Sequence, residues 1–334
     1  MDLFATLVIL SSVLYVHAWG NLGHQTIGFV AQSFLAPKAL EFVQTTLGAQ
    51  YNFSLGPAAT WADEVKSEPA FKWSADLHFV DAEDSPLTGS CSVNEQRDCG
   101  NGQCILTAIA NYTARVVDPT LDAEQIQEAL KFVGEYRFLG DIGQPLHVEA
   151  LEAGGNDIPA VCSGESSRNL HAVRSPSQDT GMVTKHIDQS HAGTTEQYAA
   201  DLVQEIQAGS FQSVAASWIS CSSPTEPLSR RSSSTEEASE EDPVGAQLES
   251  ELKRLVEARQ SGDAITPLAC PLVWAAESNA FDCSVVFNFE TGEDLCSGTY
   301  FENAIPVIDL QLAKQGFRLA AWLNVLFDGA TNLP

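Results

Sequence analysis

Basic residues are scarce in this chain of 334 residues, where 17 Lys and Arg stand against 44 Asp and Glu and the formal net charge is −27. Taken alone, this balance argues against a protein that binds nucleic acid, because phosphates seek Lys and Arg. The argument fails for a protein that meets phosphate through metal ions, since bound dications reverse the local field. Part of the excess is also local, because the tract 235–242 contains five carboxylates.

After the first residues, the chain has no hydrophobic stretch long enough to cross a bilayer. The apolar run at 3–16 is short and ends at Val16-His17-Ala18, which resembles a signal-peptidase cleavage site. We therefore expect residues 1–18 to be a secretory signal peptide, although Asp2 stands where a basic residue is usual. The predicted product is a secreted, extracellular protein that has no membrane partner and begins at Trp19.

Cys-x-x-Cys pairs are also lacking, which argues against a zinc site made of cysteine alone. The eight cysteines instead suit disulfides in an oxidising compartment. Two sequons, Asn52-Phe53-Ser54 and Asn111-Tyr112-Thr113, predict surface positions that are glycosylated in a secreted chain.

Alternating strand patterns and internal repeats are absent, whereas apolar residues recur at helical spacing along most of the chain. The tract 220–242 is rich in Ser, Pro and Glu and cannot bury enough apolar surface to order itself. The sequence therefore predicts an all-α fold with room for one small hairpin, in a single domain at 19–329 with a disordered or charged insertion at 220–265. Among the expected helices are 37–47, 104–117, 122–138, 194–207, 244–260, 266–280 and 306–327.

Four of the seven histidines lie in short motifs flanked by Gly, Asp or Asn: His24, His78, His147 and His171. The stretch from Gly140 to His147 adds a carboxylate, Asp141, six residues before an imidazole. Asp and His are the ligands that zinc accepts when it must also hold a water molecule. Any one of these histidines alone is more readily an ordinary core or surface residue, but four such motifs together favour a metal site.

The motifs resemble, in order, those of the secreted zinc-dependent single-strand-specific nucleases of the S-one and P-one type, which are related to zinc phospholipase C. The matching stretches are Trp19-Gly20-Asn21-Leu22-Gly23-His24, Trp61-Ala62-Asp63, His78-Phe79-Val80-Asp81, Gly140-Asp141 to His147, Gly154-Gly155-Asn156 and Asn169-Leu170-His171. The resemblance extends from Trp19 to about Gly329, apart from the insertion.

This resemblance implies a mainly helical, disulfide-stapled fold of the phospholipase C and nuclease P-one type that holds three zinc ions in a cleft. Carried over by motif, the zinc ligands are Trp19 through its free α-amine and carbonyl, His24, Asp63, His78, the bridging Asp141, His147, His171 and Asp179. Because an amine must be deprotonated to bind zinc, removal of the signal peptide becomes part of the chemistry.

The implied activity is that of a monomeric endonuclease and 3′-nucleotidase that hydrolyses single-stranded RNA and DNA to 5′-phosphates with zinc-activated water. Asp63, Asp141 and Lys66 are the implied catalytic residues, with Lys66 on transition-state charge. Phe79 would stack on an unpaired base, and Asp81 and Asn156 would bind its edge. The ordinary alternatives are a surface lysine at position 66 and plain core packing for Phe79.

The resemblance also implies the disulfides Cys99–Cys104 and Cys91–Cys283. It leaves Cys162, Cys221, Cys270 and Cys296, whose three possible pairings the sequence does not distinguish.

The chain departs from the family where Arg137 replaces a histidine four residues before Asp141, because a guanidinium cannot ligate zinc. One hypothesis is that the tracts 133–137, 174–178 and 220–242 are errors of gene prediction. The other is that the chain has lost a ligand, so that one zinc site is weakened and the protein is a secreted nucleotide- or zinc-binding relative. A phospholipase C-like phosphodiesterase is a further alternative, against which Phe79 and Asp81 favour the nuclease.

Overall fold

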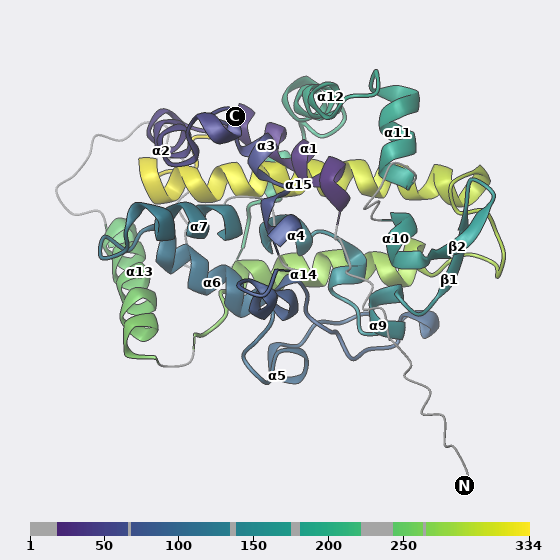
Figure 1. Cartoon of the computed structure of the whole chain (residues 1–334), viewed down its shortest axis with the longest axis horizontal. Coiled ribbons are helices and arrows are strands. Elements are labelled where there is room, and N and C mark those ends of the chain that lie inside the picture. Colours follow the sequence, from purple (N-terminus) through teal and green to yellow (C-terminus); the bar gives the residue numbers. More distant parts are fainter. Residues whose placement is uncertain (1–18, 66–67, 134–137, 175–180, 222–242, 263–264) are drawn as a thin grey trace, which may run out of the picture.

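The computed structural model describes residues 19–65, 68–133, 138–174, 181–221, 243–262 and 265–334. Its centre is α15 (Gly298–Asp328), a long helix that runs across the whole molecule (Figure 1). The helices α1 (Gly20–Ser33), α2 (Pro37–Leu47), α8 (Phe138–Asp141) and α12 (Thr195–Ala208) pack against it. The predicted all-α class is confirmed.

The last helix begins earlier than the sequence predicts. Pro306 was expected at its first turn, but α15 starts at Gly298 and contains Pro306 in its interior. An interior proline removes one backbone hydrogen bond and costs about 3 kcal/mol. Tyr300 and Ala304 before the proline and Ile308 after it are all buried in the core, and their packing offsets that cost.

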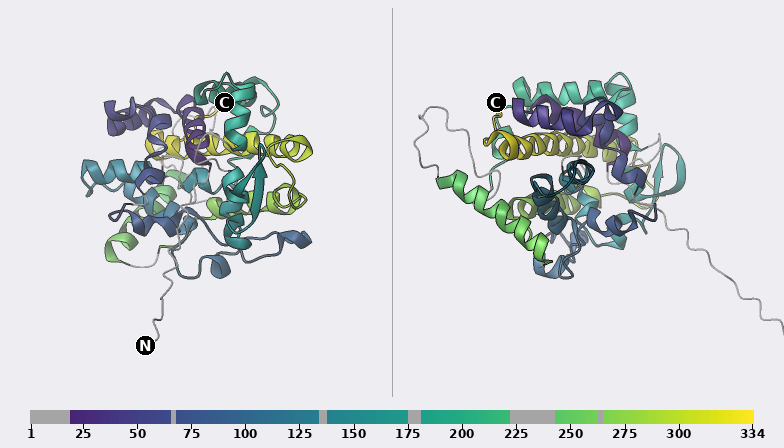
Figure 2. Two further views of the ribbon diagram at one scale, coloured as in Figure 1. Left: turned by 45° about the vertical axis from the view of Figure 1, so that its right-hand side comes forward. Right: turned by 60° about the vertical axis from the view of Figure 1, so that its left-hand side comes forward.

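The crossing of α1 and α15 depends on Gly316. A Cβ atom at this position would lie 2.5 Å from Val30 Cγ1 and 3.0 Å from the carbonyl oxygen of Ile27. The two backbones can therefore approach only because residue 316 has no side chain. This contact fixes α1, which carries the first candidate zinc ligands, against the central helix; Figure 2 shows the two helices together in both views.

A second group of helices lies beside the central one and contains α6 (Ile105–Val116), α7 (Ala123–Val133), α13 (Pro243–Ser261) and α14 (Ala269–Phe281). The predicted helix at 244–260 is thus found as α13, which packs on α6. Arg259 on α13 pairs with the buried Asp118 just after α6. Residues 222–242, where the disordered tract was expected, lie outside the described residues.

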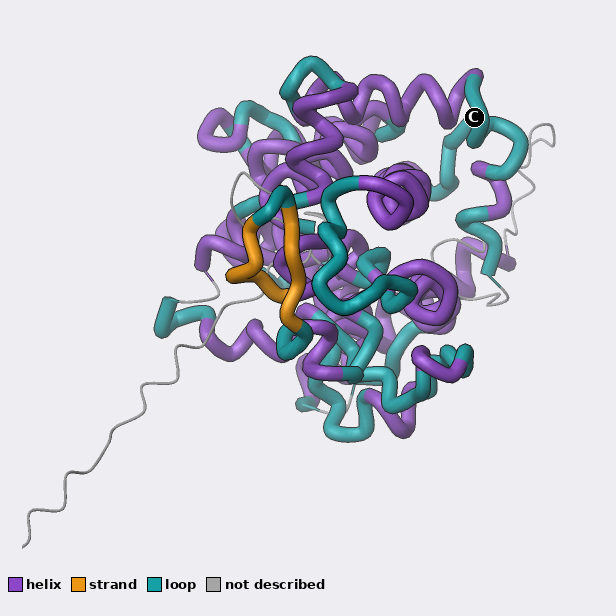
Figure 3. The backbone as a smooth tube through the Cα atoms, turned by 90° about the vertical axis from the view of Figure 1, so that its right-hand side faces the viewer, coloured by secondary structure: helices purple, strands orange, loops and turns teal. Residues whose placement is uncertain are grey.

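The strands β1 (Pro159–Cys162) and β2 (Glu165–Asn169), shown in orange in Figure 3, form an antiparallel hairpin near the middle of the chain. Pro159 pairs with Asn169 and Ala160 with Arg168. The turn between the strands, Ser163-Gly164, has positive φ at both residues. Because β2 ends where α10 (Leu170–Arg174) begins, the hairpin delivers His171 to the interior.

All eight cysteines form disulfides. Two pairs, Cys91–Cys283 and Cys99–Cys104, are those that the resemblance implies. The other two, Cys162–Cys296 and Cys221–Cys270, are the pairing that the sequence left open. Cys162–Cys296 joins β1 to the start of α15, and Cys91–Cys283 joins the loop after His78 to η7 (Asp282–Val286). These links suit an oxidising compartment.

Short helices make up most of the rest. They are η1 (Ala49–Tyr51), α3 (Leu55–Ala58), α4 (Trp61–Val65), η2 (Lys72–His78), η3 (Pro86–Thr88), α5 (Glu95–Asp98), η4 (Pro145–His147), α9 (Glu152–Gly155), α11 (Met182–Ser190) and η5 (Ala215–Ser217). Across the described ranges, none of the helices combines the length and apolar character that a membrane span requires.

Candidate metal centre

The candidate ligands lie where helices begin or end. Trp19 is the N-cap of α1, and His24 follows one turn later. His78 is the last residue of η2, Asp141 the last of α8, and His147 the last of η4. Short helices that end at a shared point place these side chains together although they are far apart in the sequence. All of these side chains are buried.

The first cluster forms around the carboxylate of Asp141. Its Oδ1 lies 3.2 Å from His24 Nε2, and its Oδ2 lies 2.9 Å from His78 Nδ1. The backbone nitrogen of Trp19 is 3.4 Å from the same His24 Nε2. The indole of Trp19 donates to the carbonyl oxygen of Gly140 at 2.8 Å, which holds Trp19 beside Asp141.

Burial alone would raise the pKa of Asp141. The charge of His147, together with hydrogen bonds from His24 and His78, outweighs burial and holds the pKa of this carboxyl below its usual value. Asp141 is therefore an anion inside the protein, as a bridging metal ligand must be.

The second cluster is a pair of imidazoles. His147 Nε2 and His171 Nε2 face each other at 3.2 Å. The opposite nitrogen of each ring contacts a backbone carbonyl: His147 Nδ1 is 2.6 Å from the oxygen of His78, and His171 Nδ1 is 2.8 Å from that of Gly154. A carbonyl can only accept, so both Nδ1 atoms carry hydrogen. The two rings therefore direct their Nε2 atoms at each other.

These distances fit zinc. Two atoms that are each 2.0–2.1 Å from one tetrahedral zinc ion lie about 3.3 Å apart. Observed separations are 3.4 Å for Trp19 N and His24 Nε2, and 3.2 Å for both the His24–Asp141 and the His147–His171 contacts. Carbonyls that hold the far nitrogen of a histidine are the usual second layer of a metal site. The donor types, and the spacings apart from the 2.9 Å between His78 Nδ1 and Asp141 Oδ2, thus match the group that the resemblance implies.

Several implied ligands lie outside the described part of the chain. These ligands are Asp179 and the side chain of Asp63, whose backbone belongs to α4. The implied catalytic residue Lys66, and Arg137 at the position of the family's histidine, also lie outside the described residues. Among the side chains that are described, no three of His, Cys, Asp or Glu form a metal-binding group. The described donors form two incomplete clusters, and the implied acids Asp63 and Asp179 would have to complete them.

The segment 78–82 carries the implied base-binding residues. It lies along residues 147–150, with Val80 N donating to the His147 carbonyl and Ala150 N to that of Ala82. Side chains alternate in an extended segment, so Val80 and Ala82 are buried while Phe79 is half-buried and Asp81 exposed. Asn156 follows α9, and its Oδ1 accepts from Asn169 Nδ2 at 3.4 Å.

Sequence reasoning missed the backbone groups that orient the ligands. The carbonyls of His78, Gly140 and Gly154 each hold a candidate ligand in place. Gly154 has a positive φ of 61°, and a Cβ there would lie 2.5 Å from the Leu146 carbonyl oxygen. The signal for it was the pair Gly154-Gly155, because consecutive glycines often mark a backbone that side chains would obstruct.

The remaining described histidines form a different pair. His191 Nε2 lies 3.1 Å from His186 Nε2, and His191 Nδ1 lies 2.6 Å from Asp201 Oδ2. His186 Nε2 is also 3.1 Å from Asp309 Oδ1, which accepts the hydroxyl of Tyr198. Burial and then the Asp309 carboxylate raise the pKa of Tyr198, so its hydroxyl remains a donor. These groups line a cavity of about 400 Å³ between α11, α12 and α15.

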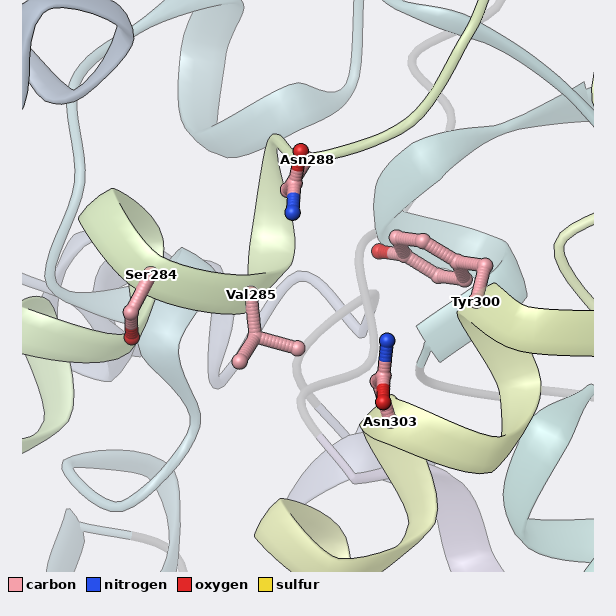
Figure 4. A pocket seen from close by; sticks show the side chains of 5 residues that line it. All are labelled: Ser284, Val285, Asn288, Tyr300 and Asn303. Carbon is pink, nitrogen blue, oxygen red and sulfur yellow. The ribbon is translucent and has the colours of Figure 1, made fainter.

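A further cavity of about 300 Å³ lies at the start of α15 (Figure 4). Tyr300 and Asn303 from α15 face Asn288 and the η7 residues Ser284 and Val285 across it. Among the described residues of the implied site, none lines this cavity. The sequon residue Asn52 is exposed and Asn111 on α6 is half-buried, and their glycosylation stays a prediction.

The S1/P1 Nuclease family model matches residues 19–328. Nuclease P1 of Penicillium citrinum is 37% identical over 312 residues, covering 92% of this chain and 97% of that protein. Nuclease S1 of Aspergillus oryzae is 34% identical over 314 residues, covering 93% and 92%. Endonuclease 3 of Arabidopsis thaliana is 26% identical over 339 residues, covering 100% and 97%.

The matched region begins at Trp19, the expected first residue of the mature chain, and ends with the last residue of α15. With that match, and with two fungal relatives above 30% identity over nearly their full lengths, the chain belongs to the S1/P1 nuclease family.

Proposed function

We propose that this protein is a secreted zinc-dependent endonuclease and 3′-nucleotidase that hydrolyses single-stranded RNA and DNA to 5′-phosphate products. The observation that carries the proposal is the His147–His171 pair. The two Nε2 atoms lie 3.2 Å apart, and a backbone carbonyl accepts the Nδ1 hydrogen of each ring. Two histidine Nε2 atoms at this spacing, on rings that are each held at Nδ1 by a backbone carbonyl, are an arrangement that one zinc ion can bind. Family membership supports the same activity.

Three zinc ions are the expected complement. Trp19 and His24 would hold one ion, Asp141 would bridge it to a second held by Asp63 and His78, and His147, His171 and Asp179 would hold the third. When bound, zinc supplies a nucleophilic water at neutral pH and positive charge for the phosphoryl oxygens. The protein's scarcity of Lys and Arg then poses no obstacle to a phosphate substrate.

The chain's own residues would select and orient the substrate. Phe79 presents a half-buried ring beside His78, and Asp81 follows on the same side of the extended segment. A base stacked on Phe79 would place its phosphate next to the cluster at His78 and Asp141. Stacking needs an unpaired base, so this arrangement selects single strands without any reading of sequence. In this proposal Asp81 and Asn156 bind the base edge, and Lys66 acts on transition-state charge.

The proposal requires a free amine at Trp19. The secreted chain that begins at Trp19 should contain zinc by mass spectrometry and cleave single-stranded DNA and a 3′-nucleotide. A matched chain that retains Ala18 keeps every side chain but has a peptide nitrogen at Trp19. We expect this control to lose one zinc ion and most of its activity. Equal zinc content and equal activity in both chains would contradict the role of Trp19.

The sequence observation at Arg137 favours a second candidate, a catalytically impaired relative that binds nucleotides or zinc. The same measurements separate the two functions. A processed chain that carries fewer zinc ions, binds a 3′-nucleotide and cleaves nothing is this impaired relative. Cleavage of lecithin in preference to single-stranded DNA would instead identify a phospholipase C-like phosphodiesterase. If Arg137→His then restored zinc and nuclease activity, the loss of a ligand would be established as the cause.

A further inference from the structure

Two buried glutamines of the central helix lie against the segment that carries Asp141. Gln311 and Gln315 are about one turn apart on α15, and both are fully buried. The amide nitrogen of Gln311 donates to the carbonyl oxygen of Gly143 at 2.6 Å. The amide nitrogen of Gln315 donates to the carbonyl oxygen of Leu139 at 2.8 Å. The two accepting carbonyls thus belong to the residues on either side of Asp141, at equal distance along the chain.

The partners of Gln311 fix which of its two amide atoms faces Gly143. Its nitrogen also lies 2.9 Å from Ser278 Oγ, and that hydroxyl donates its single hydrogen to the Trp274 carbonyl at 3.0 Å. The Ser278 oxygen must therefore accept, as the Gly143 carbonyl must, and only the amide nitrogen can donate to both. Gln311 thus has one orientation, in which it is a donor to Gly143.

Arg318 fixes the amide of Gln315 in the same way. Its Nη1 donates to the side-chain oxygen of Gln315 at 3.2 Å, and its Nη2 donates to the Glu277 carboxylate at 2.5 Å. A guanidinium can only donate, so the oxygen of Gln315 faces Arg318 and the nitrogen faces Leu139. A side chain at position 143 would displace this amide, because a Cβ at Gly143 would lie 2.4 Å from Gln315 Cγ.

The segment with Asp141 needs support from outside because its own helix is short. α8 has four residues, and a helix of that length is not stable by itself. The carbonyls at the end of a helix also lack partners within it. The helix α15 has 31 residues and crosses the molecule, so donors on it hold these carbonyls at fixed positions (Figure 1).

We propose that Gln311 and Gln315 are positioning residues for the candidate metal centre, which fix the Asp141 carboxylate between His24 and His78. This inference rests on the proposed function, in which Asp141 bridges two zinc ions. A bridging carboxylate directs one oxygen at each ion, so a shift of its backbone weakens both contacts. Glutamine suits this task because it donates hydrogen bonds without a charge. The ammonium group of a lysine at either position would repel the dications.

Gln311→Met tests the proposal, because methionine is similar in size but has no donor. The chain that begins at Trp19, first treated with a chelator, is titrated with zinc in competition with a chromogenic chelator. Its zinc affinity should fall about 10- to 100-fold. At saturating zinc, kcat for thymidine 3′-monophosphate should fall and KM should stay unchanged, because the position of Asp141 affects the reacting phosphate. Gln315→Met should change the affinity in the same direction and replaces Gln311→Met if that variant does not fold.

Asn324→Leu is the matched control on the same helix. Asn324 is also fully buried, and its amide nitrogen donates to the carbonyls of Phe34 and Thr331 at 2.9 and 2.7 Å. Neither of these residues is a candidate zinc ligand. Asn324→Leu should therefore lower the melting temperature and leave the zinc affinity at the wild-type value.

Unchanged zinc affinity in Gln311→Met overturns the proposal, and so does an equal loss in Asn324→Leu, which would indicate general destabilisation. Failure of the proposed function looks different, because the wild type would then bind no zinc. In that case, hydrogen exchange of the backbone amides at 138–148 decides the matter. Faster exchange there in Gln311→Met than in Asn324→Leu supports the positioning role, and equal exchange overturns it.

Discussion

Two histidine pairs in this protein have nearly the same geometry and different chemical requirements. His147 and His171 face each other through Nε2 at 3.2 Å, and His186 and His191 do so at 3.1 Å. In the first pair both Nδ1 hydrogens are committed to backbone carbonyls. In the second pair only His191 is committed in this way, to Asp201.

The two pairs therefore differ in which ring nitrogens can carry the hydrogen. In the second pair, His186 can carry its hydrogen on Nε2 and donate it to His191 Nε2 and Asp309 Oδ1, so two neutral rings suffice. In the first pair both rings carry a hydrogen on Nδ1, so the two Nε2 atoms that face each other are suited to bind one metal ion. A distance between two imidazoles therefore does not identify a metal site; the partners of the other ring nitrogens do.

The largest expected effect is the removal of one imidazole from each pair. His171→Ala should lose a zinc ion and at least about 100-fold in activity on single-stranded DNA, because charge stabilisation at the reacting phosphate disappears. His186→Ala is the matched control and should retain its zinc content and activity. Zinc counted by mass spectrometry and initial rates measure both. Equal losses in the two variants would show that the pairs do not differ as we infer.

Chelation should distinguish the pairs through stability. A metal ion that binds only the folded protein stabilises it by about 3 kcal/mol at a hundredfold excess over its dissociation constant. Removal of zinc should therefore lower the melting temperature by roughly 5–10 °C. The decrease should be smaller in His171→Ala, which has less zinc to lose, and unaltered in His186→Ala. If the melting temperature of the wild type did not change when a chelator was added, a structural metal centre would be contradicted.

The carbonyl of Gly154 allows the first pair to be altered without touching a histidine. Gly154→Ala forces a Cβ to within 2.5 Å of the Leu146 carbonyl oxygen at a φ of 61°, so the carbonyl that orients His171 must move. We expect a 10- to 100-fold loss of zinc affinity or activity. Gly164→Ala is the control, since its φ of 81° adds similar strain in an open turn with no atom within 4 Å of the new Cβ. Comparable losses in both variants would point to general destabilisation instead.

The smallest expected effect is on the second pair. Asp201→Asn replaces the carboxylate that accepts from His191 Nδ1 and should destabilise the protein by about 1–2 kcal/mol. Urea unfolding measures this change. Zinc content and nuclease rates should stay at wild-type values, because His186 and His191 can form hydrogen bonds with each other and with Asp309 without a metal ion. A loss of bound zinc in Asp201→Asn would assign a metal to the second pair and remove the contrast between the two.

Local chemistry made much of this molecule predictable. Helical spacing of apolar residues gave the all-α class and predicted the last helix at 306–327, which is the C-terminal part of α15. The start of that helix was misplaced at Pro306, because a proline at a first turn and a proline inside a well-packed helix look alike in a sequence. Only burial of the residues on both sides distinguishes them.

The sequence by itself determined which metal donors are present: imidazoles, aspartates and a tryptophan whose amine cleavage would expose. Each of them lies in a short motif that can be identified in the sequence. Only the tertiary structure decided which donors lie together and that Cys162 pairs with Cys296 and Cys221 with Cys270. It also decided that His147 and His171 face each other with carbonyls at their other nitrogens, whereas His186 and His191 each contact a carboxylate. The physical reason is that the fate of each ring proton depends on carbonyl and carboxylate partners supplied by segments distant in the chain, which no local pattern encodes.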